Sequence, residues 1–339
     1  MRTLLFGLTC SLALSACGDE GAAPRDGGAL FVDAGADLDV AMFDAGDASA
    51  LASNWRSEPP LPVVLQEISA VTLDGRIWVV GGFEEFRDVG TVRIFDPSSG
   101  AWTLGPALPA PRHHLALAVV GGDLYVLGGM ETIGFDLVDT AWVLRAGASE
   151  WTPLAPLPEA RGAGYAGVVD GTIYLVGGQG PGEVLSADTL IYDPATNAWT
   201  IGAAIPSPRE HLAGFVYDGE IWALGGRAFT LSTNTAVVEI YDPATDTWRS
   251  GLPLRLARGG FAASVLDDVA YVVGGEQPDR ALHEVEALHL PRGAWRTLER
   301  VPTPRHGHAM ATAAGRIWVI GGADEPIFAA VNVVESFAP

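Results

Sequence analysis

Histidine and glutamate side chains gather at one level of a repeated pattern, where they could transfer protons or bind a ligand. Imidazole and carboxylate groups are the usual general acids and bases, and both can also ligate metals. No two of these histidines have a helical or hairpin ligand spacing, so the spacing predicts no metal site. The residues are His113, His114, His211, His306 and His308, with Glu67 and Glu210 beside them.

An arginine stands ten residues after each of five regularly spaced tryptophans, and Leu65 takes this position in the first copy. A ring of guanidinium groups at a channel mouth could hold a carboxylate through paired hydrogen bonds. The alternative is that a residue repeated in nearly every copy serves the fold, by donating to loop carbonyls. Both interpretations stay open. The residues are Arg112, Arg161, Arg209, Arg258 and Arg305.

We predict a ligand site at this level for an anionic or sugar-like ligand or a peptide. Polar residues that break the repeat are the better candidates, because framework periodicity does not require them. Small residues at the same level, Gly162, Ala163, Gly259 and Gly260, leave room for a ligand. We assign no catalytic residue and expect no cofactor. The candidate site consists of Arg112, His114, Arg209, His211, Arg227, Glu276, Arg305 and His308.

Glycine pairs punctuate the chain at regular intervals. They begin at residues 81, 128, 177, 225, 274 and 321, which are 47 to 49 residues apart. An aromatic residue stands three positions before each pair, and a period near 48 is typical of a propeller blade. A series of tryptophans has the same period: Trp55, Trp102, Trp151, Trp199, Trp248 and Trp295.

Each repeat predicts four short strands. In the third copy, residues 165–169 are apolar, and Asp170-Gly171 forms the hairpin turn to residues 173–176, which run into the glycine pair. Both residues of an Asp-Gly turn accept positive φ at low cost. A longer loop follows, then a strand at residues 190–192 and a last strand that carries Trp199.

The glycine pair, the aromatic residue before it and the tryptophan resemble the kelch repeat, over residues 55–339. The resemblance implies an all-β propeller of four-stranded blades. The sixth glycine pair has no tryptophan after it, and Trp55 has no glycine pair before it. We therefore predict six blades, with the N-terminal strand around Trp55 completing the last blade beside the strand that ends at Phe337.

The kelch resemblance leaves binding and catalysis open. Galactose oxidase shares the repeat but uses a Cys-linked tyrosine, and both cysteines of this chain lie in its first seventeen residues. N-acetylneuraminate epimerase, a six-bladed exported kelch mutarotase, is similar in size and compartment. The segments from glycine pair to tryptophan vary little in length, so no long insertion covers a site. We favour a binding module for a protein, peptide or carbohydrate, with a sugar mutarotase as the alternative.

The N-terminus predicts export and lipid anchoring. Residues 4–13 are apolar but too short to span a bilayer, and they lead to Leu14-Ser15-Ala16-Cys17. This ending resembles a bacterial lipobox, which implies a signal peptide over residues 1–16 and acylation of Cys17. Residues 17–54 are rich in Asp, Gly and Ala and predict a flexible tether. Gly18, which is not acidic, favours the outer membrane.

The charge of the chain limits its partners. Asp and Glu number 41 against 20 Lys and Arg, a formal net charge of -21. An acidic surface repels phosphate, so nucleic acid and anionic lipid headgroups are poor partners, and we expect no nucleic acid to bind. We expect a monomer that meets the membrane only through its lipid.

Overall fold

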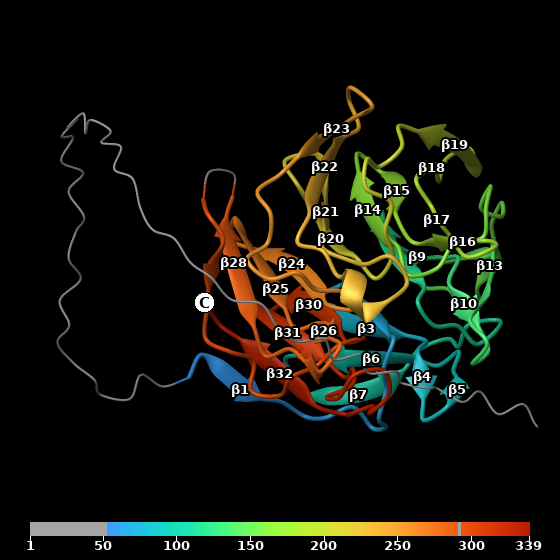
Figure 1. Ribbon diagram of the computed structural model, residues 1–339. Coiled ribbons are helices and arrows are strands. Elements are labelled where there is room, and N and C mark those ends of the chain that lie inside the picture. Colours follow the sequence, from blue (N-terminus) through green and yellow to red (C-terminus); the bar gives the residue numbers. More distant parts are fainter. Residues whose placement is uncertain (1–52, 291–292) are drawn as a thin grey trace, which may run out of the picture. The chain divides into compact units, whose positions relative to one another are not determined.

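The computed structural model describes residues 53–290 and 293–339. Six four-stranded antiparallel sheets succeed one another around a central channel, as a propeller (Figure 1). The predicted signal peptide, Cys17 and almost all of the tether lie outside the described residues. Within these residues, no helix has the length and apolarity that a membrane span needs.

The two inner strands of each blade form a hairpin. The innermost strands are β2 (Ser69–Leu73), β8 (Ala116–Val120), β14 (Tyr165–Val169), β20 (Ala213–Tyr217), β24 (Ala262–Leu266) and β30 (Ala309–Ala313). Their partners are β3 (Arg76–Val80), β9 (Asp123–Leu127), β15 (Thr172–Val176), β21 (Glu220–Leu224), β25 (Val269–Val273) and β31 (Arg316–Ile320).

The two outer strands complete each sheet. The third strands are β6 (Val92–Asp96), β12 (Ala141–Leu144), β18 (Thr189–Asp193), β22 (Val238–Asp242), β28 (Val285–His289) and β32 (Val334–Phe337). The outermost strands are β7 (Ala101–Leu104), β13 (Thr152–Pro153), β19 (Ala198–Gly202), β23 (Thr247–Ser250), β29 (Arg296–Thr297) and β1 (Trp55–Ser57).

The N-terminal strand closes the ring, as the sequence predicts. β1 pairs antiparallel with β32, with Trp55 opposite Phe337, and the sheet has the order β1-β32-β31-β30. The two aromatic rings pack with centroids 5.1 Å apart. The last blade is therefore made from both ends of the described chain (Figure 1).

The repeated tryptophans link neighbouring blades. Each donates its indole N–H to a backbone carbonyl in the segment between the preceding blade and its own. Trp55 donates to Glu299, at 3.4 Å, and so joins the last blade to the fifth. The other pairs are Trp102 with Pro59, Trp151 with Pro106, Trp199 with Ala155, Trp248 with Ala203 and Trp295 with Leu252.

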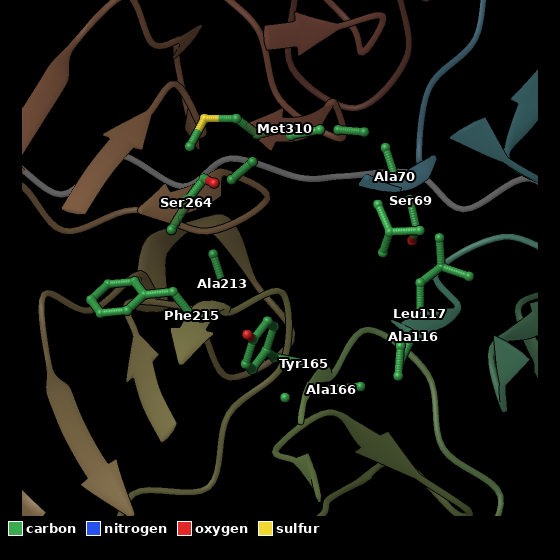
Figure 2. A pocket seen from close by; sticks show the side chains of 18 of the residues that line it. Ser69, Ala70, Ala116, Leu117, Tyr165, Ala166, Ala213, Phe215, Ser264 and Met310 are labelled. Carbon is green, nitrogen blue, oxygen red and sulfur yellow. The ribbon is translucent and has the colours of Figure 1, made fainter. Parts of the chain in front are cut away.

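The innermost strands line a channel with a volume of about 540 Å³. Many of the side chains that face it are small, such as Ser69, Ala116 and Ala213, while Leu117, Tyr165, Phe215 and Met310 are larger (Figure 2). The strands can approach one another closely around the axis because these side chains need little space.

The loops after the glycine pairs have structure of their own. Four fold back as small hairpins, and the fourth blade has a short 3-10 helix, η1 (Leu231–Thr233). The hairpin strands are β4 (Phe83–Glu84) with β5 (Arg87–Asp88), β10 (Met130–Glu131) with β11 (Asp136–Leu137), β16 (Gln179–Gly180) with β17 (Val184–Leu185), and β26 (Glu276–Gln277) with β27 (Arg280–Ala281).

Candidate functional site

Two loops of each blade meet on one face of the propeller. In every blade, a residue just before the innermost strand forms an isolated β-bridge with the residue directly after the glycine pair. The loop from the tryptophan and the loop from the glycine pair therefore share a face, as expected from the sequence. The bridges are Gln66–Phe83, His113–Met130, Gly162–Gln179, Glu210–Arg227, Gly259–Glu276 and His306–Ala323.

In each blade, the residue that follows the first member of this bridge points to the axis of the propeller. These six residues together form a ring around the channel. All six members have left-handed backbone, with φ between 50° and 64°. Their backbone N–H groups donate to the carbonyl of the preceding member, and Ile68 N closes the circle onto Gly307 O. Glycine adopts this conformation freely, whereas other residues adopt it at a cost. The inner ring consists of Glu67, His114, Ala163, His211, Gly260 and Gly307.

Three side chains of the inner ring converge. His114 Nε2 lies 3.0 Å from His211 Nε2 and 3.1 Å from Glu67 Oε2. Burial alone would raise the pKa of Glu67, but the facing histidines, His114 first, outweigh it and hold that pKa well below its usual range. The sequence identifies these three residues as repeat-breaking, and the propeller brings them together from three blades.

A second layer of groups holds this cluster. His211 Nδ1 contacts Glu210, and Glu210 accepts a hydrogen bond from Arg227 Nε at 3.1 Å. His114 Nδ1 lies 2.5 Å from His113 Nδ1. Burial, and then the neighbouring His114, lower the pKa of His113 to about 3. Its ring is therefore neutral at ordinary pH.

Arg227 and Glu276 lie beside the cluster, where the sequence predicts them. Arg227 Nη1 donates to Glu276 Oε1 at 2.6 Å, and its Nε bonds Glu210. One guanidinium thus faces two buried carboxylates, and Glu67 adds a third nearby. These groups give this part of the site an excess of negative charge, whereas the sequence argument expects a positive one.

The expectation that Arg112, Arg209 and Arg305 face the channel mouth is corrected by the structure. Their side chains are almost completely buried, at 0 to 2% exposure. Each donates to the first glycine of its blade's pair, for example Arg112 Nη1 to Gly128 O at 2.9 Å. Each also pairs with a glutamate: Glu131, Glu239 and Glu335 respectively.

These arginines therefore serve the framework, which is the alternative that the repeat itself suggests. Arg258 is placed in the same way, with Gly274 O and Glu286 as partners. Arg161 donates to Asp188 O at 2.7 Å. The physical reason is that a buried guanidinium needs several acceptors, and the glycine carbonyls supply them close by.

His308 also lies away from the mouth. It is buried in the channel wall, and it lines a cavity of about 140 Å³ together with Glu67, His114 and His211. His306 stands nearer the cluster, with its Nδ1 3.7 Å from Glu67 Oε1 and 3.6 Å from Glu276 Oε2. Its Nε2 lies 2.9 Å from Glu325 O.

A cavity of about 410 Å³ opens above the cluster. His114, His211, Arg227 and Glu276 line its floor, and apolar side chains form its wall. The sequence does not predict this wall, because the near-constant length of the repeats favours short, open loops after the glycine pairs. Large apolar residues inside those polar loops were the available signal. The wall consists of Phe83, Phe135, Phe229, Leu231, Ile327 and Phe328.

Fold and repeat together define a six-bladed β-propeller, and the chain belongs to the kelch-repeat family. The profile of the KLHDC2/KLHL20/DRC7 Kelch-repeats domain matches residues 25–204, and that of the Kelch motif matches residues 208–252. The structure named "Structure of YjhT" superposes with a TM-score of 0.73 at 16% identity, over 82% of this chain and 95% of that one. A likeness at this identity supports the fold alone.

Curated relatives carry kelch names as well. Kelch-like protein terF of Aspergillus terreus is 29% identical over 81% of this chain and 64% of its own length. Kelch-like protein 35 of Mus musculus is 33% identical over 50% of this chain and 30% of its own. The chain thus spans less than two thirds of these relatives. Neither the family match nor the curated relatives favour the alternative of a sugar mutarotase.

Proposed function

We propose that this chain is a protein-interaction module, whose propeller binds an extended segment of a partner protein at the cavity above the histidine cluster. Kelch-like proteins are the curated relatives, which supports an interaction role over a catalytic one. The finer proposal is that acylated Cys17 holds the module on the bacterial cell envelope, at the outer membrane.

The apolar wall of the cavity carries this proposal. Seven of the eleven exposed large hydrophobic side chains of the described residues lie on the loops after the glycine pairs. Four of the seven, Phe135, Phe229, Ile327 and Phe328, line the cavity. Apolar groups gathered at one opening mark an interaction site, whereas single scattered ones do not. The seven are Phe86, Ile133, Phe135, Val184, Phe229, Ile327 and Phe328.

The charge at the floor of the cavity limits which peptide segments of a partner can bind there. Glu210 and Glu276 face one guanidinium at the floor, Glu67 lies nearby, and the whole chain carries a net charge of -21. The framework arginines do not offset this, because glutamates already pair with most of them. An apolar or aromatic anchor next to a basic group therefore suits the cavity better than the carboxylate or acidic sugar that the sequence suggested.

A phage-displayed peptide library selected on the immobilised full-length chain tests the proposal. Selected peptides should combine an aromatic or aliphatic residue with Lys or Arg. Phe229→Ser should weaken their binding roughly 10- to 30-fold, as expected when about 2 kcal/mol of apolar burial is lost. The control is Leu104→Ser, an exposed apolar side chain on outer strand β7, away from the cavity. Equal binding to Phe229→Ser and to the parent would overturn the choice of this face.

A further inference from the structure

We propose that Glu67, His114 and His211 form a binding site for one divalent transition-metal ion, with zinc as the best match. The ligand atoms are Glu67 Oε2 and the Nε2 atoms of the two histidines. All three lie within 4.8 Å of one another. The site lies at the floor of the cavity described above, but the proposal does not require the peptide interaction. It differs from the prediction from chain spacing, which gave no metal site.

The distances between the ligand atoms suit a tetrahedral ion. With metal–ligand bonds of about 2.0–2.1 Å, two ligand atoms of a tetrahedral zinc site stand about 3.3 Å apart. His114 Nε2 is 3.0 Å from His211 Nε2 and 3.1 Å from Glu67 Oε2. For these two pairs an ion needs only small outward shifts, and the third pair, Glu67 Oε2 and His211 Nε2, lies within 4.8 Å. Two imidazoles and one carboxylate are also a common ligand set for zinc with an open position.

The hydrogen bonds of His211 leave a lone pair for the ion. Its Nδ1 faces a Glu210 carboxylate oxygen, which can only accept when ionised. Nδ1 therefore carries the proton, and Nε2 of the neutral ring is bare. Glu210 in turn accepts from Arg227 Nε. A carboxylate behind a ligating histidine is the usual support for a metal site, since it fixes the tautomer and orients the ring.

The ring of His114 is oriented through a longer chain of hydrogen bonds, which runs through His113. His113 Nε2 lies 3.1 Å from the carbonyl of Thr132, to which it must donate. With that proton on Nε2, His113 Nδ1 can accept from His114 Nδ1, which lies 2.5 Å away. With Nδ1 turned to His113, Nε2 is the His114 atom that faces Glu67 Oε2 and His211 Nε2. With neither a proton nor a metal ion between them, His114 Nε2, His211 Nε2 and Glu67 Oε2 would repel one another.

The backbone conformation that places these side chains is strained. Glu67, His114 and His211 have φ of 53°, 50° and 51°, in the left-handed region that glycine fills at 260 and 307 of the same ring. Such strain in residues other than glycine clusters at functional sites. Ala163 stands between the two histidines in ring order, and its small side chain leaves room for their rings to meet.

The proposed ion has a free coordination position. Glu67, His114 and His211 line both the 410 Å³ cavity of the mouth and the smaller one of about 140 Å³ beneath it. The ion would therefore close the neck between them. Its remaining position could take water or a donor atom of a bound partner. The rival occupant is a single shared proton, which would neutralise the same repulsion without a metal.

Zinc titration by calorimetry distinguishes a bound metal ion from a shared proton. The protein is the full-length chain with Cys10→Ser and Cys17→Ser, which removes both thiols as competing ligands. The metal-free parent should bind one Zn²⁺, while Ca²⁺ and Mg²⁺, which prefer oxygen ligands, should not compete. His114→Gly and His211→Gly should each weaken zinc at least 100-fold. Glycine suits the left-handed backbone, so these variants should fold.

The matched control is His289→Ala, an exposed histidine at the end of β28, which should leave zinc affinity unchanged. Glu210→Gln should weaken zinc 10- to 100-fold through His211 alone. Co²⁺ gives a second measurement on the parent, whose visible absorption should show tetrahedral coordination. A shared proton alone predicts no stoichiometric zinc and no such spectrum. The absence of stoichiometric zinc binding by the parent, or of a tetrahedral cobalt spectrum, would overturn the proposal. Full zinc binding by both histidine variants would overturn it as well.

Discussion

His114 Nε2 lies 3.0 Å from His211 Nε2, although 97 residues separate the two in the sequence. Both side chains occupy the same position of the inner ring, in the second and fourth blades, with Ala163 between them. The contact is made by the ring of left-handed residues, which turns each side chain toward the axis. The geometry of the cluster therefore depends on what stands at the other ring positions.

Gly307→Ala should weaken zinc binding at least tenfold. A Cβ at Gly307 would overlap Glu67 Oε1 and come within 3.1 Å of Glu67 N, so the carboxylate must move. Gly260→Ala is the control, because its φ is similarly positive, 64° against 56°, and its Cβ would meet nothing closer than 3.5 Å. Calorimetry on both variants measures the difference. If both affinities fall equally, backbone strain and not Glu67 is the cause.

Glu286→Gln should lower the free energy of unfolding by about 3–5 kcal/mol, the usual effect of breaking a buried ion pair. Glu286 pairs with Arg258 at 2.6 Å, and both side chains are buried. Glu220→Gln, which breaks the exposed pair with Arg249, should cost less than about 1 kcal/mol. Urea unfolding of both variants checks this. Similar small losses would show that Arg258 is not a framework residue.

The sequence was sufficient to predict the ring and its closure, because glycine pairs and tryptophans recur with one period and the missing last tryptophan is found at Trp55. It was not sufficient for the arginines, since the same period fits a ligand ring and a framework. A signal was available: Glu239, Glu286 and Glu335 stand 28 to 30 residues after Arg209, Arg258 and Arg305. A basic residue that recurs with an acidic partner is paired within the fold.

The histidine cluster could be predicted only in part. Breaks in the repeat identify His114, His211 and Glu67 as unusual, but spacing along the chain does not say which of them meet. That depends on side-chain direction, and the positive φ of the inner ring, which sets it, is unexpected for Glu and His. The apolar wall of the cavity was missed because it depends on how the loops fold back.

Cys17→Ser should abolish lipid attachment. We expect radiolabelled palmitate to enter the parent and the Cys10→Ser variant but not Cys17→Ser, because Cys10 leaves with the signal peptide in the lipobox interpretation. The variant should also move from the membrane to the soluble fraction, since it has lost the acyl chains that hold it. Equal labelling of all three proteins would exclude Cys17 as the anchor.

His308 should make the fold sensitive to mild acid. Burial, followed by the charges of Arg305 and His306, lowers its pKa well below the ordinary value of 6.5. The unfolded chain therefore binds a proton below about pH 6.5 that the folded chain does not. Stability is complete above this pH and is lost as the pH falls, by about 1.4 kcal/mol per pH unit for one such group.

His308→Gln removes this titration while keeping a polar side chain of similar size. Between pH 6.5 and 5, the free energy of unfolding of the variant should therefore fall less steeply than that of the parent, by about 1.4 kcal/mol per pH unit. Urea unfolding in EDTA measures both slopes without bound metal. His289→Gln, at an exposed position, should keep the parent's slope. Parallel slopes for the parent and His308→Gln would mean that His308 takes up its proton in the folded protein.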